Sequence, residues 1–191
     1  MNKLKRLFDL FLCIVAVVIC IIPICILCLL VYLTSAGPIL YWSDRVGKDN
    51  VIFKMAKFRS MKVGIPAIAT HLLECPESVL TPVGSFLRKS SLDELPQLWN
   101  VFIGDMSLVG PRPERPVFTR QFSKTLPTYM ARHAVKAGMT GWAQVNGWRG
   151  NTSLRKRLQY DLYYIVHWTP WLDLKILWMT VFHGFTHKNA Y

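Results

Sequence analysis

Acidic residues are scarce in this sequence. Its 191 residues include 11 Asp and Glu but 23 Lys and Arg, which gives a formal net charge of +12 at pH 7. This imbalance predicts an anionic partner, such as membrane headgroups or the phosphates of a small molecule. Nucleic acid is a third anionic partner, but the basic residues are dispersed and carry no nucleic-acid-binding motif, so we expect no nucleic acid.

Charged residues are missing altogether from Leu10 to Ser43. Within this segment, Leu10 to Leu33 is almost wholly apolar, and its 24 residues would extend over roughly 36 Å as a helix. That length can cross a hydrocarbon core of about 30 Å, whereas the apolar region of a signal peptide is only about 7–15 residues long. The segment therefore predicts a membrane helix, and the rest of the chain has the composition of a globular domain.

Two features favour a helix that enters the membrane and returns over one that crosses it. Pro23 lies near the middle of the apolar segment, where it removes a backbone hydrogen bond and bends the helix. Basic residues flank both ends, so charge gives no orientation across the bilayer and both ends can lie at the cytoplasmic face. We predict a re-entrant membrane-anchoring helix over 1–36 and a separate domain over 37–191, with a simple spanning helix as the alternative.

Neither the cysteines nor the histidines are spaced like a metal or disulfide site. Four of the five cysteines lie in the apolar segment, where Cys25 and Cys28 have CxxC spacing without a second pair or a nearby His. His183 and His187 are four residues apart, but Gly184 lies between them near the end of the chain. We expect reduced thiols that act as small apolar residues, and a main body in the cytosol.

The rest of the chain predicts an α+β fold that is predominantly helical. Residues 39–42 and 51–56 are β-prone and flank the turn-forming GKDN, which predicts a small β-hairpin. The segments expected to be helical are 81–106 in two pieces, 117–133 and 152–166. The segments expected to be loops, because Pro and Gly gather there, are 63–80 with room for a short helix, 107–116 and 136–150.

The C-terminal segment 168–185 has apolar residues nearly all round, including three tryptophans. Asp173, Lys175 and His183 interrupt it too often for a helix that crosses a membrane. Two interpretations stay open. The segment is either an interfacial amphipathic helix with its Trp side chains at headgroup depth, or a helix packed into the core of the domain.

The stretch SLDE, residues 91–94, places two carboxylates side by side in a chain that has few. One interpretation is structural: Ser91 and Glu94 would form a capping box at the start of a helix, where Asp93 also suits the helix dipole. The surroundings favour chemistry as well, because a helix start can bind anions and cations gather near it in the sequence. These cations are Lys57, Arg59, Arg88, Lys89 and Arg112.

This mixture of charges predicts a type of reaction. A carboxylate among cations should have a depressed pKa, so we expect Asp93 to be ionised at neutral pH. An ionised carboxylate can attack phosphorus, and a second one beside it can hold a divalent cation that neutralises phosphate charge. An arginine on a Pro-rich loop is suited to binding phosphate through two hydrogen bonds. Together with the apolar anchor, these features indicate phosphoryl transfer at a membrane surface.

Four stretches resemble the bacterial sugar transferase family. They are KRLFDL, KFRSM, LRKSSLDELPQLWNVFIGDMSLVGPRPE and GMTGWAQVNGWRG, which follow the family order over nearly the whole chain. Members of this family are monotopic phosphoglycosyl transferases, which move a sugar 1-phosphate from a nucleotide sugar to a polyprenol phosphate. The stretch from NGWRG onward is similar to the undecaprenyl-phosphate glucose phosphotransferase branch, although galactose-transferring relatives share much of it.

The resemblance implies a role for each candidate site residue. Asp93 is expected to attack the β-phosphate of a UDP-sugar, forming a phosphosugar-aspartyl intermediate and releasing UMP. Glu94, assisted by Asp93, is expected to bind Mg²⁺. Undecaprenyl phosphate then takes the sugar phosphate, which initiates the assembly of exopolysaccharide, capsule or lipopolysaccharide O-antigen glycans. The residues expected to bind phosphate or line the site are Lys57, Arg59, Arg88, Arg112 and Arg149.

The resemblance also implies a location and partners. The family's membrane helix is re-entrant, here with its break at Pro23, and Lys5 and Arg6 would sit at the headgroups of the bacterial inner membrane. The catalytic domain would face the cytoplasm. The expected partners are a UDP-sugar, undecaprenyl phosphate and the phospholipid bilayer, and a homo-oligomer is left open.

Three alternatives remain. The same reaction could use galactose or an N-acetylated sugar in place of glucose. The polyprenol phosphate could attack the nucleotide sugar directly, with Asp93 acting only as a base. Outside the enzymes, the chain could be a membrane-anchored scaffold that binds anionic lipid through its basic face.

Overall fold

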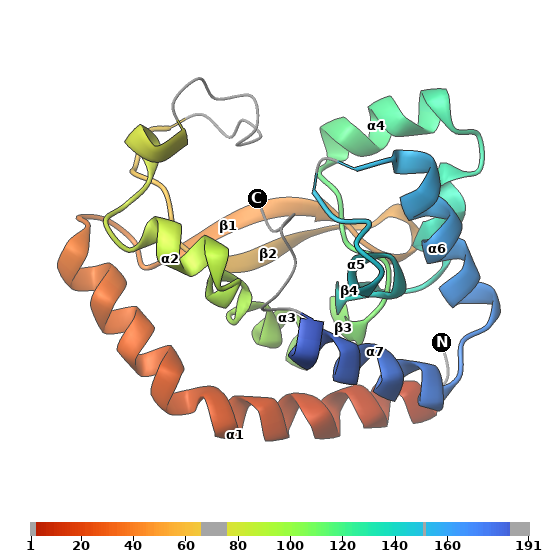
Figure 1. The fold of residues 1–191 in the computed structure, drawn as a ribbon, viewed down its shortest axis with the longest axis horizontal. Helices are drawn as coiled ribbons and strands as arrows, with labels where there is room; N and C mark the ends of the chain where they lie inside the picture. Colours follow the sequence, from red (N-terminus) through yellow and green to blue (C-terminus); the bar gives the residue numbers. More distant parts are fainter. Residues whose placement is uncertain (1–2, 66–75, 151, 184–191) are drawn as a thin grey trace.

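The computed structural model describes residues 3–65, 76–150 and 152–183. Within these ranges the fold is predominantly helical with two small two-stranded sheets, in agreement with the predicted α+β class. The long helix α1 (Lys3–Thr34) lies along one side of the molecule, and the other elements lie together beside it (Figure 1). Cys75, His187 and the centre of the loop predicted at 63–80 are outside the described residues.

Helix α1 covers the apolar segment, as predicted. It is the one helix among the described residues that is long and apolar enough to cross a membrane by length and composition. Pro23 lies within it, and the left-hand part of α1 in Figure 1 turns upward toward α2 (Gly84–Lys89). This change of direction agrees with a helix bent by proline.

Both halves of α1 pack against the same folded body. The first half contributes Cys13 to a buried cluster that includes Ile176 of α7 (Pro170–His183). The second half contributes Leu27 to another cluster, which includes Leu87 of α2. The remaining surface of α1 exposes apolar side chains, among them Leu7, Phe11, Ile14, Val18, Ile19, Ile22, Ile26, Leu29 and Leu33. The helix is therefore attached at both ends and apolar on its outer face.

The predicted hairpin is present. Strands β1 (Leu40–Val46) and β2 (Ile52–Phe58) pair antiparallel, and β1 extends further than expected. The GKDN turn contains the 3-10 helix η1 (Lys48–Asn50), in which Asp49 and Asn50 have φ angles of 53° and 64°. Asp and Asn tolerate this left-handed conformation better than most residues, so the turn can close without glycine at either position.

The two predicted loops at 107–116 and 136–150 contain strands, so that prediction was incomplete. Strand β3 (Met106–Val109) pairs in parallel with β4 (Ala137–Thr140), and all four residues of β3 are buried. A Cβ atom on Gly138 would lie 2.1 Å from the backbone nitrogen of Gly110. Gly138 therefore allows two backbones to approach closely and does not form a turn. Its glycine-rich surroundings nevertheless resemble a loop in the sequence.

The helical predictions hold with changes at their ends. Segment 81–106 contains two helices, α2 and α3 (Gln97–Ile103), and α6 (Leu154–Val166) fills most of 152–166. Segment 117–133 is divided into α4 (Pro116–Thr125) and η5 (Tyr129–Ala134), because Pro127 keeps Leu126 extended. The remaining elements are η3 (Pro76–Val79), η4 (Leu92–Glu94) and α5 (Trp142–Val145).

Helix α7 has features of both interpretations of the C-terminal segment. Ile176 and Asp173 are fully buried, so one side of the helix packs into the domain core. Trp171 and Trp178 are 77% and 67% exposed on its outer surface. Packing into the core is therefore confirmed, and contact of these tryptophans with a membrane stays a prediction.

The start of α1 is held by a buried ion-pair network. Lys5 Nζ lies 2.8 Å from Asp9 Oδ1 and 2.9 Å from Asp173 Oδ2, and all three side chains are at most 1% exposed. The prediction that Lys5 contacts headgroups is therefore wrong, because two buried carboxylates require its charge. Arg6 donates to the carbonyl oxygens at the end of α3, where a cation suits the helix dipole.

The end of α1 is held by Arg59. This side chain is 5% exposed, and its guanidinium donates to the carbonyl oxygens of Ser35 and Ala36, each at 2.6 Å. The position contradicts the prediction that Arg59 lines a phosphate site. Carbonyl groups that follow a helix need donors, and Arg59 supplies them directly after α1.

Candidate active site

The two carboxylates lie in η4, between α2 and α3. The predicted capping box is not formed. Ser91 has a φ angle of 57°, in the left-handed region, and its side chain makes no capping hydrogen bond. Its hydroxyl oxygen instead accepts a hydrogen bond from Arg149 Nη2 at 3.1 Å. The chain makes only a single tight turn here, which directs both carboxylates inward instead of starting a long helix.

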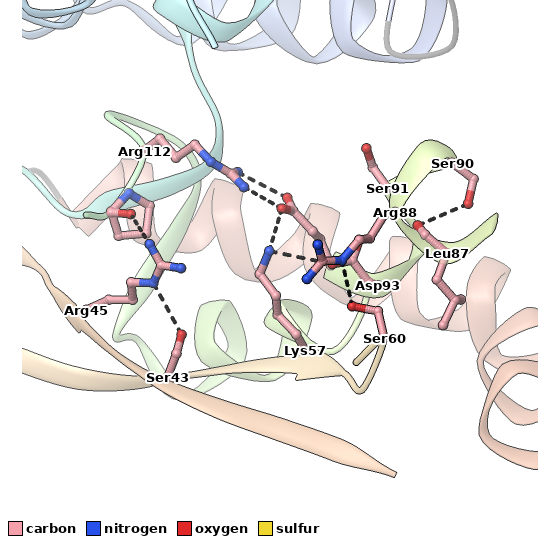
Figure 2. Close-up of polar contacts among 12 residues, drawn as sticks. Ser43, Arg45, Lys57, Ser60, Leu87, Arg88, Ser90, Ser91, Asp93 and Arg112 are labelled. Atoms are coloured by element: carbon pink, nitrogen blue, oxygen red, sulfur yellow. Dashed lines mark hydrogen bonds and ion pairs between the residues drawn. The ribbon is translucent and has the colours of Figure 1, made fainter. Parts of the chain in front are cut away.

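Glu94 is held by two cations, Lys57 and Arg112, both of which are labelled in Figure 2. Lys57 Nζ donates to Glu94 Oε1 at 2.8 Å, and Arg112 Nη1 donates to Oε2 at 3.1 Å. Arg112 Nη2 also donates to Oε1, which makes the arginine contact bidentate. Burial by itself would raise the pKa of Glu94, but Arg112 and Lys57 outweigh it and hold that pKa well below its usual range. Glu94 is therefore ionised at neutral pH.

Asp93 has a different environment although it is the adjacent residue. It is 3% exposed, and its nearest ion-pair contact is Lys57 Nζ, 3.6 Å from Oδ2. Among the residues that the structure describes, Asp93 Oδ1 has no hydrogen-bond partner. Burial raises the pKa of Asp93, while Lys57 opposes the shift and Glu94 adds to it. The prediction of a depressed pKa is wrong for Asp93, because burial outweighs the effect of the nearby cations, which Glu94 engages more closely.

Two further predicted residues lie close to the carboxylates. Arg88, in the last turn of α2, donates from Nε to Ser60 Oγ at 2.9 Å and lies beside Asp93 in Figure 2. Its charge is also among the influences that lower the pKa of Asp93. Arg149 reaches the same turn through Ser91. The structure thus brings Lys57, Arg88, Arg112 and Arg149 around η4, and leaves Arg59 at the end of α1.

Arg45 is a neighbour of this site that the sequence did not single out. Its Nη1 donates to the carbonyl oxygen of Pro113 at 3.1 Å, and its Nε donates to Ser43 Oγ at 3.2 Å. Burial lowers the pKa of Arg45 to about 10, and the nearby charges of Arg112 and Arg115 contribute. Arg45 is one of the basic residues that follow the apolar segment, and no local sequence signal indicates that it lies near Arg112.

The carboxylate pair fits one way of binding Mg²⁺. In the described ranges no group of three or more His, Cys, Asp and Glu side chains could hold a metal ion. Magnesium, however, is often bound by one or two carboxylates together with substrate phosphates and water. The unpartnered Oδ1 of Asp93 and the adjacent carboxylate of Glu94 are suitable hard oxygen ligands. The donor set therefore fits a metal shared with a substrate, and not a site built by protein alone.

Comparison with known proteins identifies the family of this chain. Residues 1–187 match the family described as bacterial sugar transferase. The chain belongs to the bacterial sugar transferase family. This assignment confirms the resemblance of the four sequence motifs, and the match includes both α1 and the turn with the carboxylate pair.

Several curated members of the bacterial sugar transferase family are similar to this chain. The UDP-glucose:undecaprenyl-phosphate glucose-1-phosphate transferase of Escherichia coli (strain K12) is 45% identical over 98% of the chain and 41% of the relative. The UDP-N-acetylgalactosamine-undecaprenyl-phosphate N-acetylgalactosaminephosphotransferase of Aeromonas hydrophila is 38% identical over 93% of the chain and 43% of the relative. The exopolysaccharide production protein PSS of Rhizobium leguminosarum bv. phaseoli is 36% identical over 98% of each chain. The chain thus spans less than half of the first two relatives and nearly all of the third.

Proposed function

We propose that this chain is a phosphoglycosyl transferase that moves a sugar 1-phosphate from a UDP-sugar to undecaprenyl phosphate and releases UMP. One observation carries the proposal: a buried carboxylate with an unpartnered oxygen, Asp93 Oδ1, lies among cations in a chain with a long apolar helix. Such a carboxylate can act as a nucleophile, and the cations suit the phosphates of its substrate. The names of the relatives from E. coli and A. hydrophila support the same reaction class.

The first step is attack by an Asp93 carboxylate oxygen on the β-phosphorus of the UDP-sugar. A bond forms between this oxygen and phosphorus, and the bond between the β-phosphorus and the bridging oxygen breaks. UMP leaves with the bridging oxygen and its electron pair. The sugar 1-phosphate remains covalently attached to Asp93 as an acyl phosphate.

The second step transfers the sugar phosphate to the lipid. A phosphate oxygen of undecaprenyl phosphate attacks the same phosphorus, and the bond to Asp93 breaks. The products are undecaprenyl diphosphate sugar and a free Asp93 carboxylate. The sugar keeps its bond to the transferred phosphate throughout, so each step exchanges one oxygen–phosphorus bond for another.

The unequal environments of the two carboxylates support this division of roles. Glu94 is ionised and held by Arg112 and Lys57, so it suits a fixed charge that organises phosphate and metal. Asp93 is buried and less closely paired, and its raised pKa makes its carboxylate a stronger nucleophile once ionised. Opposite pKa shifts in adjacent acids are a common indication of distinct catalytic roles.

Cations and a divalent metal would assist the chemistry. Arg88 and Arg112 would bind the phosphates of the UDP-sugar, and Lys57 would orient both carboxylates. Arg149, which donates to Ser91, would approach the substrate from the loop before α6. Glu94 and Asp93 would hold Mg²⁺, which when bound would neutralise negative charge on the phosphates.

We also propose that α1 is re-entrant in the bacterial inner membrane, with the site on the cytoplasmic side. The two halves of α1 pack on one body, and its ends are held there by Lys5 and Arg59. A straight spanning helix would have to separate from the body at one of these ends. The exposed tryptophans of α7 would then lie at headgroup depth, as would Arg6 beside the start of α1.

Glucose is the sugar we propose first, because the relative from E. coli transfers glucose 1-phosphate by its name and has the higher identity. An N-acetylated sugar is the alternative that the A. hydrophila relative supports. The name of the R. leguminosarum relative supports a place in exopolysaccharide production. A screen of UMP release with UDP-glucose, UDP-galactose and N-acetylated UDP-sugars, each with undecaprenyl phosphate, distinguishes these sugars.

The covalent route is tested with a UDP-sugar alone. A burst of UMP stoichiometric with the enzyme, and a matching mass increase on the peptide that contains Asp93, are expected. Absence of both the burst and the adduct would favour direct attack by the polyprenol phosphate. Asp93→Asn protein that folds, binds membranes and keeps its biological activity would instead favour the lipid-binding scaffold.

A further inference from the structure

The loop that carries Arg112 is held through its carbonyl groups. Prolines flank Arg112 on both sides, and proline has no N–H group to donate. All four carbonyl oxygens from Pro111 to Glu114 accept a hydrogen bond from another element. The donor and acceptor pairs are Gly138 N to Pro111 at 2.9 Å, Arg132 Nη2 to Arg112 at 2.8 Å, Arg45 Nη1 to Pro113 at 3.1 Å, and Val46 N to Glu114 at 2.9 Å.

Arg132, which holds the carbonyl of Arg112 itself, is firmly fixed in turn. Its Nε and Nη2 donate to Asp161 Oδ2 of α6 at 3.0 and 2.7 Å, and its Nη1 donates to the Tyr129 hydroxyl at 2.9 Å. Arg132 is 1% exposed and Asp161 is 2% exposed. Burial by itself would lower the pKa of Arg132, but Asp161 raises it above its ordinary value. The guanidinium is therefore charged, buried and hydrogen-bonded through Nε, Nη1 and Nη2.

The backbone and the side chain of Arg112 make different contacts. Its backbone oxygen accepts from Arg132, while its guanidinium donates to both carboxylate oxygens of Glu94. A bidentate contact is sensitive to position, because both hydrogen bonds require the guanidinium and carboxylate planes to match. A shift of the loop backbone would therefore weaken the contact with Glu94 and with any phosphate bound beside it.

We propose that Arg132 and Asp161 are positioning residues for Arg112. They hold the loop backbone so that the Arg112 guanidinium reaches Glu94 and the phosphates of the UDP-sugar together. This inference rests on the proposed function, in which Arg112 binds substrate phosphate. It assigns a structural use to part of the chain's positive charge, which composition alone would attribute to anionic partners.

The test is a double-mutant cycle between Arg132→Lys and Arg112→Ala, measured as UMP release from the preferred UDP-sugar. Lysine keeps the charge at 132 but cannot bond to Asp161 and to the Arg112 carbonyl as arginine does. We expect Arg132→Lys to raise KM for the UDP-sugar and to lower kcat/KM about tenfold. In the Arg112→Ala background it should add less than about twofold, because coupled residues are non-additive.

The control is Arg155→Lys, the same substitution at an exposed position of α6, which should change neither KM nor kcat/KM. Multiplicative losses in the double variant, or a lower kcat at unchanged KM, would overturn the positioning role. If the wild-type protein releases no UMP from any UDP-sugar, the proposed function fails and this inference falls with it. Thermal unfolding of each variant shows whether a loss reflects misfolding.

A milder variant keeps the test decisive if Arg132→Lys does not fold. Tyr129→Phe removes a single hydrogen bond to Arg132 and leaves the ion pair with Asp161 intact. It should raise KM by about twofold to fivefold in wild-type protein and leave KM nearly unchanged in the Arg112→Ala background. An equal rise in both backgrounds would contradict the inference.

Discussion

Asp93 and Glu94 are adjacent in the chain, yet their carboxyl groups have pKa values shifted in opposite directions. Lys57 Nζ lies 2.8 Å from a Glu94 oxygen and 3.6 Å from an Asp93 oxygen, and Arg112 bonds to Glu94. Glu94 is therefore stabilised as an anion by its partners, whereas burial dominates the pKa shift of Asp93. This asymmetry leads to different expectations for stability, activity and pH dependence at the two positions.

Asp93→Asn should abolish UMP release without lowering the stability of the protein. The amide has no charge to bury, and the carboxylate oxygen that it replaces has no partner among the described residues. Removing an incompletely paired buried charge should leave stability unchanged or raise it by about 1 kcal/mol. Thermal unfolding and UMP release measured on the same preparation check both parts. A clear drop in melting temperature would contradict the expectation.

Glu94→Gln should be destabilising, in contrast to the change at Asp93. The substitution leaves Lys57 and Arg112 close together without the anion that compensates their charges. Because Arg112 is partly exposed, we expect a loss of about 1–3 kcal/mol, below that of a fully buried pair. Denaturant unfolding measures this loss, and adding Lys57→Met to Glu94→Gln should recover part of it. No recovery would mean that repulsion between the cations is unimportant.

The fall of kcat/KM at low pH, the acid limb of the pH profile, should report protonation of Asp93. Its pKa is raised by burial, so kcat/KM should fall with acid at a pH above the ordinary range of an Asp side chain. Lys57 lowers this pKa, so Lys57→Met should move the acid limb to higher pH. A profile for kcat/KM between pH 4 and 8 tests both statements. An acid limb that moved to lower pH in this variant would contradict the assignment.

The free energy of unfolding should depend on pH through Asp93, and the raised pKa of this side chain fixes the direction. A carboxyl group with a raised folded-state pKa contributes stability that is present below its unfolded pKa of about 3.9 and is lost as pH rises through the folded pKa. The stability of wild type relative to Asp93→Asn should therefore decline as pH rises from about 4. Denaturant unfolding of both proteins over this range gives the sign. A relative gain with rising pH would show that Asp93 is ion-paired more strongly than its 3.6 Å contact indicates.

Lys5→Met should destabilise the protein strongly, although Lys5 lies far in the sequence from Asp93 and Glu94. The variant leaves Asp9 and Asp173 buried without their shared cation. We expect a loss of about 3–5 kcal/mol, of which Asp9→Asn in the same protein should recover a part. Thermal unfolding in detergent or nanodiscs measures both. The control is Lys3→Met, the same substitution at an exposed position of α1, which should have little effect.

Pro23→Ala should favour a straight spanning helix over a re-entrant one. Alanine restores the backbone donor that proline lacks, and the exposed face of α1 is apolar on both sides of this position. Cysteine labelling of residues 3–6 and 45–48 from each side of the membrane checks the topology. Labelling from opposite sides in the wild-type protein would contradict the re-entrant proposal.

Local patterns predicted much of the fold. The apolar segment, the hairpin and the helix that begins after Ser153 each depend on neighbouring residues, and each is present. The parallel strands β3 and β4 were missed because their pairing joins segments about 30 residues apart, and their glycines resemble loop residues. The capping box was wrong because a left-handed Ser91 cannot be recognised from the letters SLDE.

The sequence by itself determined that this protein has an adjacent pair of carboxylates, an excess of cations and a long apolar helix. It could not decide which cation serves which purpose, because ion pairs form between segments distant in the chain. Lys57 and Arg112 meet Glu94, but Lys5, Arg59 and Arg132 are taken up by carboxylates and carbonyl groups elsewhere in the domain. Only the tertiary structure decided this division, since the partner of a buried charge depends on packing rather than on sequence neighbours.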